Sequence, residues 1–70
     1  MADTGEDRAG TVEALYRTEH GRVVRLAYLL TGDRGAAEEI AQEAFARILP
    51  RFEELRRPAA FLTTVTVNLC

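Results

Sequence analysis

The sequence has few of the residues that build covalent and metal-bound sites. Its single cysteine is Cys70, so no disulfide can form within the chain, and a thiolate metal site would need a second chain. Its single histidine is His20, so a zinc site and a Ser-His-Asp triad both lack the necessary residues. We interpret His20 as a surface or packing residue. The sequence therefore predicts no metal and no cofactor.

Other functional segments are missing as well. The sequence contains no glycine-rich phosphate loop, no nucleophile elbow and no metal-ligand spacing. No apolar run approaches the roughly 20 residues that span a bilayer. The first residues are acidic and polar, unlike those of a secretory signal. We therefore expect a cytoplasmic protein that is not an enzyme.

The composition is that of one small globular domain. The chain has 70 residues, of which 47% are hydrophobic and 29% are charged. Its net charge of -2 argues against a general binding surface for duplex DNA. Residues 1–10 are charged and show no apolar period, which predicts a disordered leader. One domain is predicted over residues 11–70.

A first helix is predicted after the N-cap residue Thr11. Its apolar stripe comprises Val12, Leu15, Tyr16, Val23, Leu26, Ala27 and Leu30. Beyond Val23 the off-stripe positions Val24, Tyr28 and Leu29 are apolar too, so we expect this helix to be central and covered on more than one side. Gly21 predicts a bend or a local break. Gly32 suits a left-handed C-cap, and the short connection to Asp33 predicts an antiparallel helical hairpin.

A second helix is predicted from the N-cap residue Asp33 to Leu49, where Pro50 ends the pattern. At about 100° per residue, one side of this helix can face a core. That side comprises Ala37, Ile40, Ala41, Ala44 and Ile48. The opposite, polar side comprises Glu39, Gln42, Glu43 and Ala46. Phe45 and Leu49 lie on the flank between the two sides and should give the polar face an apolar edge.

The polar face contains an unbalanced charge. Glu39 and Glu43 stand four residues apart and repel each other by a few tenths of a kcal/mol on an isolated helix. Arg47 relieves Glu43, whereas nothing comparable serves Glu39. Two interpretations remain open. The face is either a solvated acidic surface or a docking surface for a basic partner.

A third helix is predicted from Pro58, which suits the first position of a helix. Before it, Phe52 and Leu55 can hold a short turn against the core. The apolar residues of the segment keep a helical spacing, and they are Phe61, Leu62, Val65 and Leu69. Residues 63–67 form a β-branched run that favours a strand. We predict a helix because the chain offers no second strand to pair with it.

Four short motifs carry a resemblance to a known family. They are Leu15-Tyr16-Arg17, Leu26-Ala27-Tyr28-Leu29-Leu30-Thr31-Gly32-Asp33, Ala37-Glu38-Glu39-Ile40-Ala41-Gln42-Glu43-Ala44-Phe45 and Val67-Asn68-Leu69. Together they resemble the second conserved region of bacterial RNA polymerase sigma factors, in the extracytoplasmic-function (ECF) group of the sigma-70 family. The Thr-Gly-Asp turn alone is a weak indication of the family. The acidic pair, the Gln-Glu pair and the Phe that follow it at this spacing make the resemblance fairly specific.

The resemblance implies an all-α domain of three helices, in which a helical hairpin is joined by a truncated third helix. It implies that Glu39, Gln42, Glu43 and Phe45 bind the clamp helices of the largest RNA polymerase subunit. It also implies that the domain recognises and opens the minus-ten promoter element on the non-template strand. Asn68 matches the family's asparagine there, although its amide could instead bond nearby backbone. An anti-sigma factor is a further partner that the family implies.

The last helix departs from the family pattern. Family members usually carry arginines and a tryptophan or tyrosine there, whereas this sequence reads Phe61-Leu62-Thr63-Thr64-Val65-Thr66-Val67. The sequence ends at Cys70, before the arginine-rich continuation, so we expect a fragment or a truncated gene. The alternative function is a small helical protein-interaction module that touches no nucleic acid.

Overall fold

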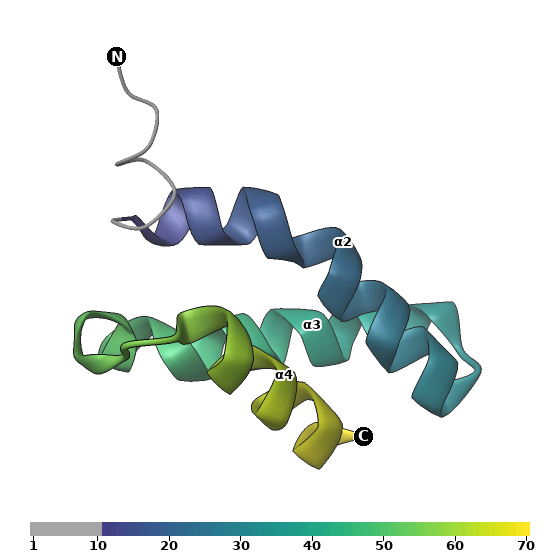
Figure 1. Cartoon of the computed structure of the whole chain (residues 1–70). Helices are drawn as coiled ribbons and strands as arrows, with labels where there is room; N and C mark the ends of the chain where they lie inside the picture. Colours follow the sequence, from purple (N-terminus) through teal and green to yellow (C-terminus); the bar gives the residue numbers. More distant parts are fainter. Residues whose placement is uncertain (1–10) are drawn as a thin grey trace.

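A computed structural model of the chain describes residues 11–70, and these residues form an all-helical fold. In chain order the elements are α2 (Val12–Thr31), α3 (Arg34–Ile48), the 3-10 helix η1 (Leu49–Glu54) and α4 (Pro58–Leu69). This architecture confirms the predicted all-α class with its helical hairpin and third helix (Figure 1). The leader predicted for residues 1–10 lies outside the described residues.

The predicted caps define the ends of the hairpin. The hydroxyl of Thr11 accepts a hydrogen bond from the Ala14 amide at 3.0 Å, and the Asp33 carboxylate accepts one from the Ala36 amide at 3.0 Å. Each bond satisfies an amide that has no partner inside its own helix. Gly32 has a φ of 74°, a left-handed conformation that favours glycine. These local signals turn the chain sharply, and α3 runs back beside α2.

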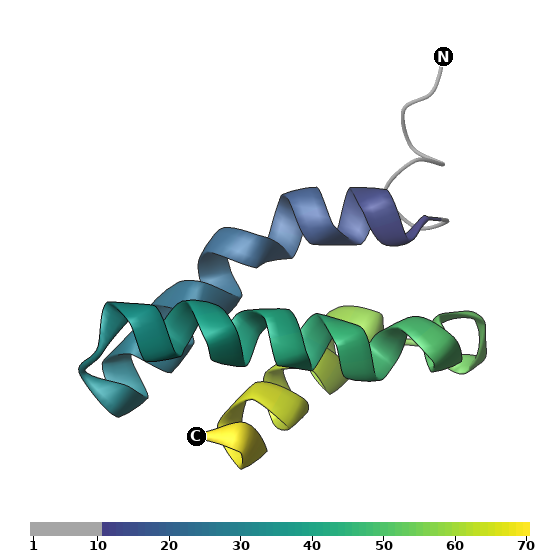
Figure 2. The same cartoon turned by 180° about the vertical axis from the view of Figure 1, so that it is seen from behind.

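Gly21 lies near the middle of α2, and the helix is continuous through it. The predicted local break is therefore absent, whereas the predicted bend is visible in both views, where α2 changes direction midway (Figures 1 and 2). A Cβ atom added to Gly21 would meet nothing within 4 Å. Packing within residues 11–70 thus leaves room for a larger side chain at this position.

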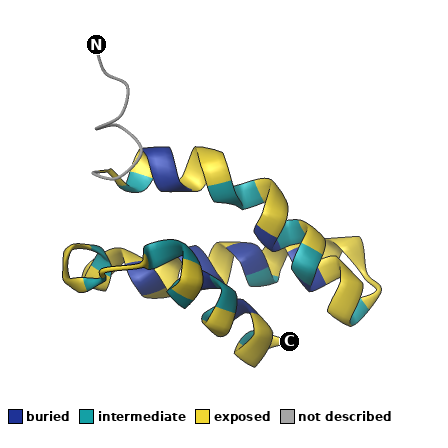
Figure 3. Cartoon of the chain, viewed as in Figure 1, coloured by how far each residue is buried: buried dark blue, intermediate teal, exposed yellow. Residues whose placement is uncertain are grey.

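The core lies where the three long helices meet (Figure 3). Its buried cluster comprises Leu15 and Val23 from α2, Ala41, Ala44, Phe45 and Ile48 from α3, and Leu62 from α4. The alanines on α3 are small enough to let the neighbouring helices approach closely. Burial of a side chain such as Ile48 or Leu62 contributes about 1.5–3 kcal/mol relative to exposure. The core-side pattern predicted for α3 is thereby confirmed, with Ile40 only half-buried.

The expectation that α2 is covered on more than one side is wrong for its C-terminal end. Leu29 is 75% exposed and Leu30 is 52% exposed. Tyr28 beside them is 46% exposed. Within the described residues α3 contributes five buried residues and α2 contributes four, so α2 is not the single central helix of the core. The continuous apolar run at the end of α2 therefore forms an apolar surface and is not completely buried.

The β-branched segment of α4 is helical, as predicted from its apolar spacing. The hydroxyls of Thr63, Thr64 and Thr66 donate hydrogen bonds to the carbonyls four residues earlier, at 3.2, 3.3 and 2.7 Å. The hydroxyl of Thr66 is thereby satisfied although this residue is fully buried. Packing of Leu62 into the core outweighs the local preference for a strand.

The connection between α3 and α4 holds the two helices against one core. Helix α3 ends at Ile48, close to the predicted end, and the chain continues through Pro50 as η1. Phe52 and Leu55 are half-buried and pack against the core cluster, as predicted. The guanidinium of Arg51 lies 5.0 Å from the centre of the Phe61 ring. This cation–π contact joins η1 to the first turns of α4.

Candidate protein and nucleic-acid interfaces

The outer face of α3 carries the predicted polar residues. Glu39, Gln42 and Glu43 are all exposed. The Arg47 guanidinium donates to the Glu43 carboxylate at 3.0 Å, in the favourable order for a helix. Among residues 11–70 no cation lies within ion-pair distance of Glu39. The face therefore presents one paired carboxylate, one unpaired carboxylate and an amide to whatever contacts it.

Phe45 does not belong to this exposed face, and its predicted place at an apolar edge is wrong. Its side chain is only 6% exposed. Its ring lies 4.8 Å from the ring of Tyr16, and the ring of Tyr16 lies 4.7 Å from that of His20. Helix α2 covers this flank of α3, which helical periodicity alone could not indicate. His20 is a packing residue, as interpreted from the sequence.

The apolar edge of the acidic face has a different composition. Leu49, the second predicted flank residue, is 49% exposed. On the other side, Ile40 and Leu69 line a shallow hollow of about 320 Å³ together with Glu39 and Glu43. Leu69 comes from the end of α4, so the hollow joins two helices. The acidic surface thus has apolar neighbours on both sides.

Asn68 directly precedes Leu69, which lines this hollow. Its side chain is exposed near the end of α4. Within the described part of the chain, no hydrogen bond joins its amide to the backbone. The amide can therefore meet an external partner without breaking an internal contact.

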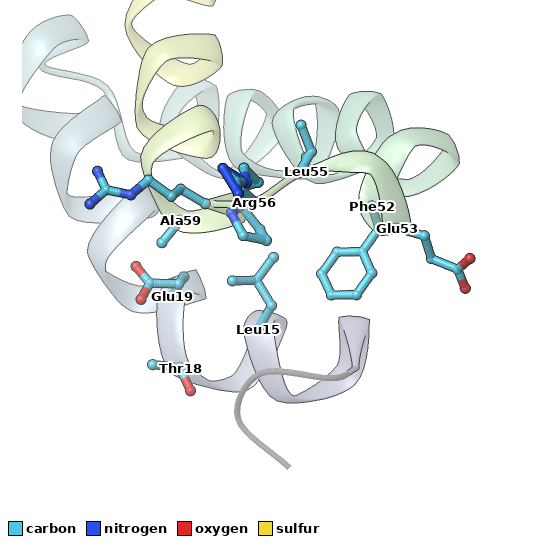
Figure 4. A pocket seen from close by; sticks show the side chains of 10 residues that line it. Leu15, Thr18, Glu19, Phe52, Glu53, Leu55, Arg56 and Ala59 are labelled. Carbon is cyan, nitrogen blue, oxygen red and sulfur yellow. The ribbon is translucent and has the colours of Figure 1, made fainter. Parts of the chain in front are cut away.

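A second, larger groove lies between α2 and the segment that leads into α4 (Figure 4). Its volume is about 500 Å³. Leu15, Phe52 and Leu55 supply apolar walls, and the charged residues of the lining are Glu19, Glu53, Arg56 and Arg57. The groove thus combines apolar surface with two guanidinium groups and two carboxylates.

Sequence reasoning missed this groove. The signal was present in the Arg56-Arg57 pair directly before Pro58. However, only the fold brings Leu15 from the start of α2 to the same place. The groove is held partly by Arg22, which pairs with Glu19 and donates to the Ala59 carbonyl at 3.3 Å.

Two features are absent from the described residues. Residues 11–70 contain no cluster of three or more His, Cys, Asp or Glu side chains that could hold a metal ion. No helix in the same range is long and apolar enough to cross a membrane. The surface of these residues presents an acidic face on α3 and a groove that contains arginines.

The comparisons with known proteins assign this helical binding domain to a family. The family described as Sigma-70 region 2 matches residues 15–70. The chain therefore belongs to the sigma-70 family, as a region 2 domain.

Relatives in two strains of one species support the same assignment. The chain is 37% identical over 60 residues to a probable ECF RNA polymerase sigma factor, SigI, of Mycobacterium tuberculosis strain CDC 1551 / Oshkosh. The same values hold for SigI of strain ATCC 25618 / H37Rv. The match covers 84% of this chain and 21% of each relative, so the chain spans about a fifth of their length. No solved structure matches significantly.

Proposed function

We propose that this domain binds the clamp helices of the RNA polymerase largest subunit through Glu39, Gln42 and Glu43. The observation that carries the proposal is the exposed outer face of α3, on which Glu39 has no described counter-charge. A basic coiled partner would relieve the Glu39–Glu43 repulsion and cover the apolar surface of Leu49. Phe45 supports this face from beneath by fixing α3 against α2.

The test is a pull-down of isolated clamp helices with the full chain. The double variant Gln42→Ala, Glu43→Arg removes the amide and reverses one charge on the exposed face. We expect it to lose at least about tenfold in affinity, which corresponds to about 1.4 kcal/mol. Arg17→Glu, an exposed charge reversal on α2, is the control and should bind like the unmodified chain. Unchanged binding of the double variant would remove the proposed docking face.

We further propose that the domain contacts the non-template strand of the minus-ten element. Asn68 would bond a base edge, and the groove beside Arg56 and Arg57 would accept an unstacked base with its phosphate. The assembly would act in the cytoplasm with core polymerase and without an active site of its own. An anti-sigma factor would regulate it by covering one of these surfaces.

One observation favours a second function, a protein-interaction module that does not touch DNA. Helix α4 (Pro58–Leu69) carries no charged residue, and the net charge of the chain is -2. Both features reduce attraction to phosphates. Crosslinking of a single-stranded minus-ten oligonucleotide to the chain, in the presence of core polymerase, separates the two functions. If crosslinks form, and if both Asn68→Ala and the double variant Arg56→Glu, Arg57→Glu abolish them, DNA contact is supported. If the unmodified chain forms no crosslinks, the protein-only module is supported.

A further inference from the structure

Arg22 lies on α2 outside the groove that contains Arg56 and Arg57, yet both of its partners line that groove. Its guanidinium pairs with the carboxylate of Glu19 on the α2 wall. It also donates a hydrogen bond to the Ala59 carbonyl on the α4 wall, at 3.3 Å. Figure 4 shows Glu19 and Ala59 at the same end of the groove. One arginine thus joins two walls that are 37 residues apart in the sequence.

Glu19 is the less exposed of the two carboxylates in the groove. Its side chain is only 16% exposed, whereas Glu53, the other acidic residue of the lining, is exposed to solvent. A carboxylate in such a position repels a phosphate that enters the groove, and it attracts any guanidinium group nearby. The negative charge of Glu19 must therefore be neutralised if the groove is to hold a phosphate.

The arginines of the groove do not supply this neutralisation. Among residues 11–70, no carboxylate lies within ion-pair distance of Arg56 or Arg57. The counter-charge of Glu19 comes from Arg22, outside the groove. Both guanidinium groups of the lining can therefore donate hydrogen bonds to a phosphodiester without leaving a described acidic partner.

We propose that Arg22 is a positioning residue for single-stranded DNA in this groove. It neutralises Glu19 and thereby keeps Arg56 and Arg57 available for the phosphates. Without Arg22, the Glu19 carboxylate attracts the groove arginines to itself and repels the DNA backbone. Arg22 acts through Glu19 and makes no contact with the DNA. This inference rests on the proposed function, because it requires that the groove accepts DNA.

The test measures the affinity of the full chain, assembled with core polymerase, for a labelled single-stranded DNA of roughly 12 nucleotides. The sequence of the DNA is randomised, because the expected effect is one of charge. Fluorescence anisotropy gives the affinity, and core polymerase alone is the blank. Arg22→Ala should bind the DNA about fivefold more weakly. The dependence of log affinity on log salt concentration should become shallower by about 0.7, the value of one phosphate contact on a single strand.

Arg17→Ala is the matched control. It removes the same charge from an exposed residue of α2 that does not line the groove and forms no ion pair within residues 11–70. It should change the affinity by less than about twofold. An equal loss in Arg17→Ala and Arg22→Ala would overturn the proposal, because the effect would then be one of net charge.

Removal of the carboxylate together with the arginine separates the charge effect from a structural one. The double variant Glu19→Gln, Arg22→Ala should recover an affinity within about twofold of the unmodified chain, although the bond to Ala59 is still missing. Glu19→Gln alone should change the affinity by less than about twofold, because Arg22 already neutralises that carboxylate. A double variant that binds no better than Arg22→Ala would overturn the proposal. Ion pairs near the surface contribute little to stability, so thermal unfolding should give similar midpoints for all of these variants.

One further variant distinguishes failure of this inference from failure of the proposed function. Arg56→Glu, Arg57→Glu reverses both positive charges of the groove and should weaken DNA binding at least about tenfold. If it has no effect, the proposed DNA contact at the groove and this inference both fail. If it weakens binding while Arg22→Ala does not, the groove binds DNA and only the role of Arg22 is overturned.

Discussion

The ring of Phe45 on α3 lies against the ring of Tyr16 on α2, with centroids 4.8 Å apart and planes inclined by 58°. This tilted geometry is typical of favourable aromatic pairs, which contribute about 0.5–1.5 kcal/mol beyond the area they bury. Phe45 is buried, whereas Tyr16 is 45% exposed and shields it from solvent. The contact fixes the rotation of α3, and that rotation decides which of its residues face outward.

Truncation of this ring should be costly. Phe45→Ala is expected to lower the free energy of unfolding by about 3–5 kcal/mol, because it leaves a cavity in the core. Leu49→Ala is the control, since Leu49 was predicted on the same flank but is half exposed. It should cost less than about 1 kcal/mol. Urea unfolding followed by circular dichroism measures both, and equal losses would contradict the burial of Phe45.

Removal of Arg47 should strengthen the proposed clamp interaction. Its guanidinium pairs with Glu43, so Arg47→Ala frees that carboxylate and makes the face more acidic. We expect a two- to fivefold tighter complex with clamp helices, or roughly 0.5–1 kcal/mol, and an effect that shrinks as salt rises. The isolated domain should lose about 0.3–0.5 kcal/mol of stability. A weaker complex at low salt would show that Arg47 itself contacts the partner.

Two glycines should respond in opposite directions to the same substitution. Gly21→Ala is expected to stabilise the domain by about 0.5–1 kcal/mol, because α2 is helical there and the added methyl group has space. Gly32→Ala should destabilise it by about 1–2 kcal/mol, because its φ of 74° is unfavourable for alanine. Thermal unfolding of the two variants side by side checks the contrast. A loss of stability in Gly21→Ala would assign this glycine to the bend of α2.

The cap of α3 gives a smaller and equally specific effect. Asp33→Ala removes the acceptor of the Ala36 amide and should cost about 1 kcal/mol. Asp33→Ser keeps an oxygen at the cap and should recover most of that loss. Chemical denaturation of both variants provides the measurement. An equal loss in the two would indicate that the carboxylate acts through its charge rather than as a hydrogen-bond acceptor.

Local chemistry explains what could be predicted from the sequence. The caps at Thr11 and Asp33 and the left-handed Gly32 depend on neighbouring residues only, and all three were predicted correctly. The outward direction of Glu39, Gln42 and Glu43 follows from helical periodicity and also holds.

The errors arise where one helix meets another. Periodicity places Phe45 on a flank but does not say that α2 covers that flank. In the same way, it could not indicate that Leu29 stays exposed although its neighbours are apolar. The groove beside Arg56 was missed because Leu15, which lines it, is distant in the sequence. Which helix packs against a given side of another helix depends on the tertiary fold, and the sequence of one segment does not determine it.

The threonine hydroxyls of α4 have a consequence for the order in which the domain opens. Thr63, Thr64 and Thr66 bond to carbonyls of their own helix, and such bonds add little helix propensity to a β-branched segment. The helical conformation of α4 is therefore maintained by the packing of Leu62 and the half-buried apolar residues around it against the core. Amide protons of residues 63–67 should exchange with deuterated water sooner than those around Ala41, which makes α4 the first segment to unwind from the hairpin.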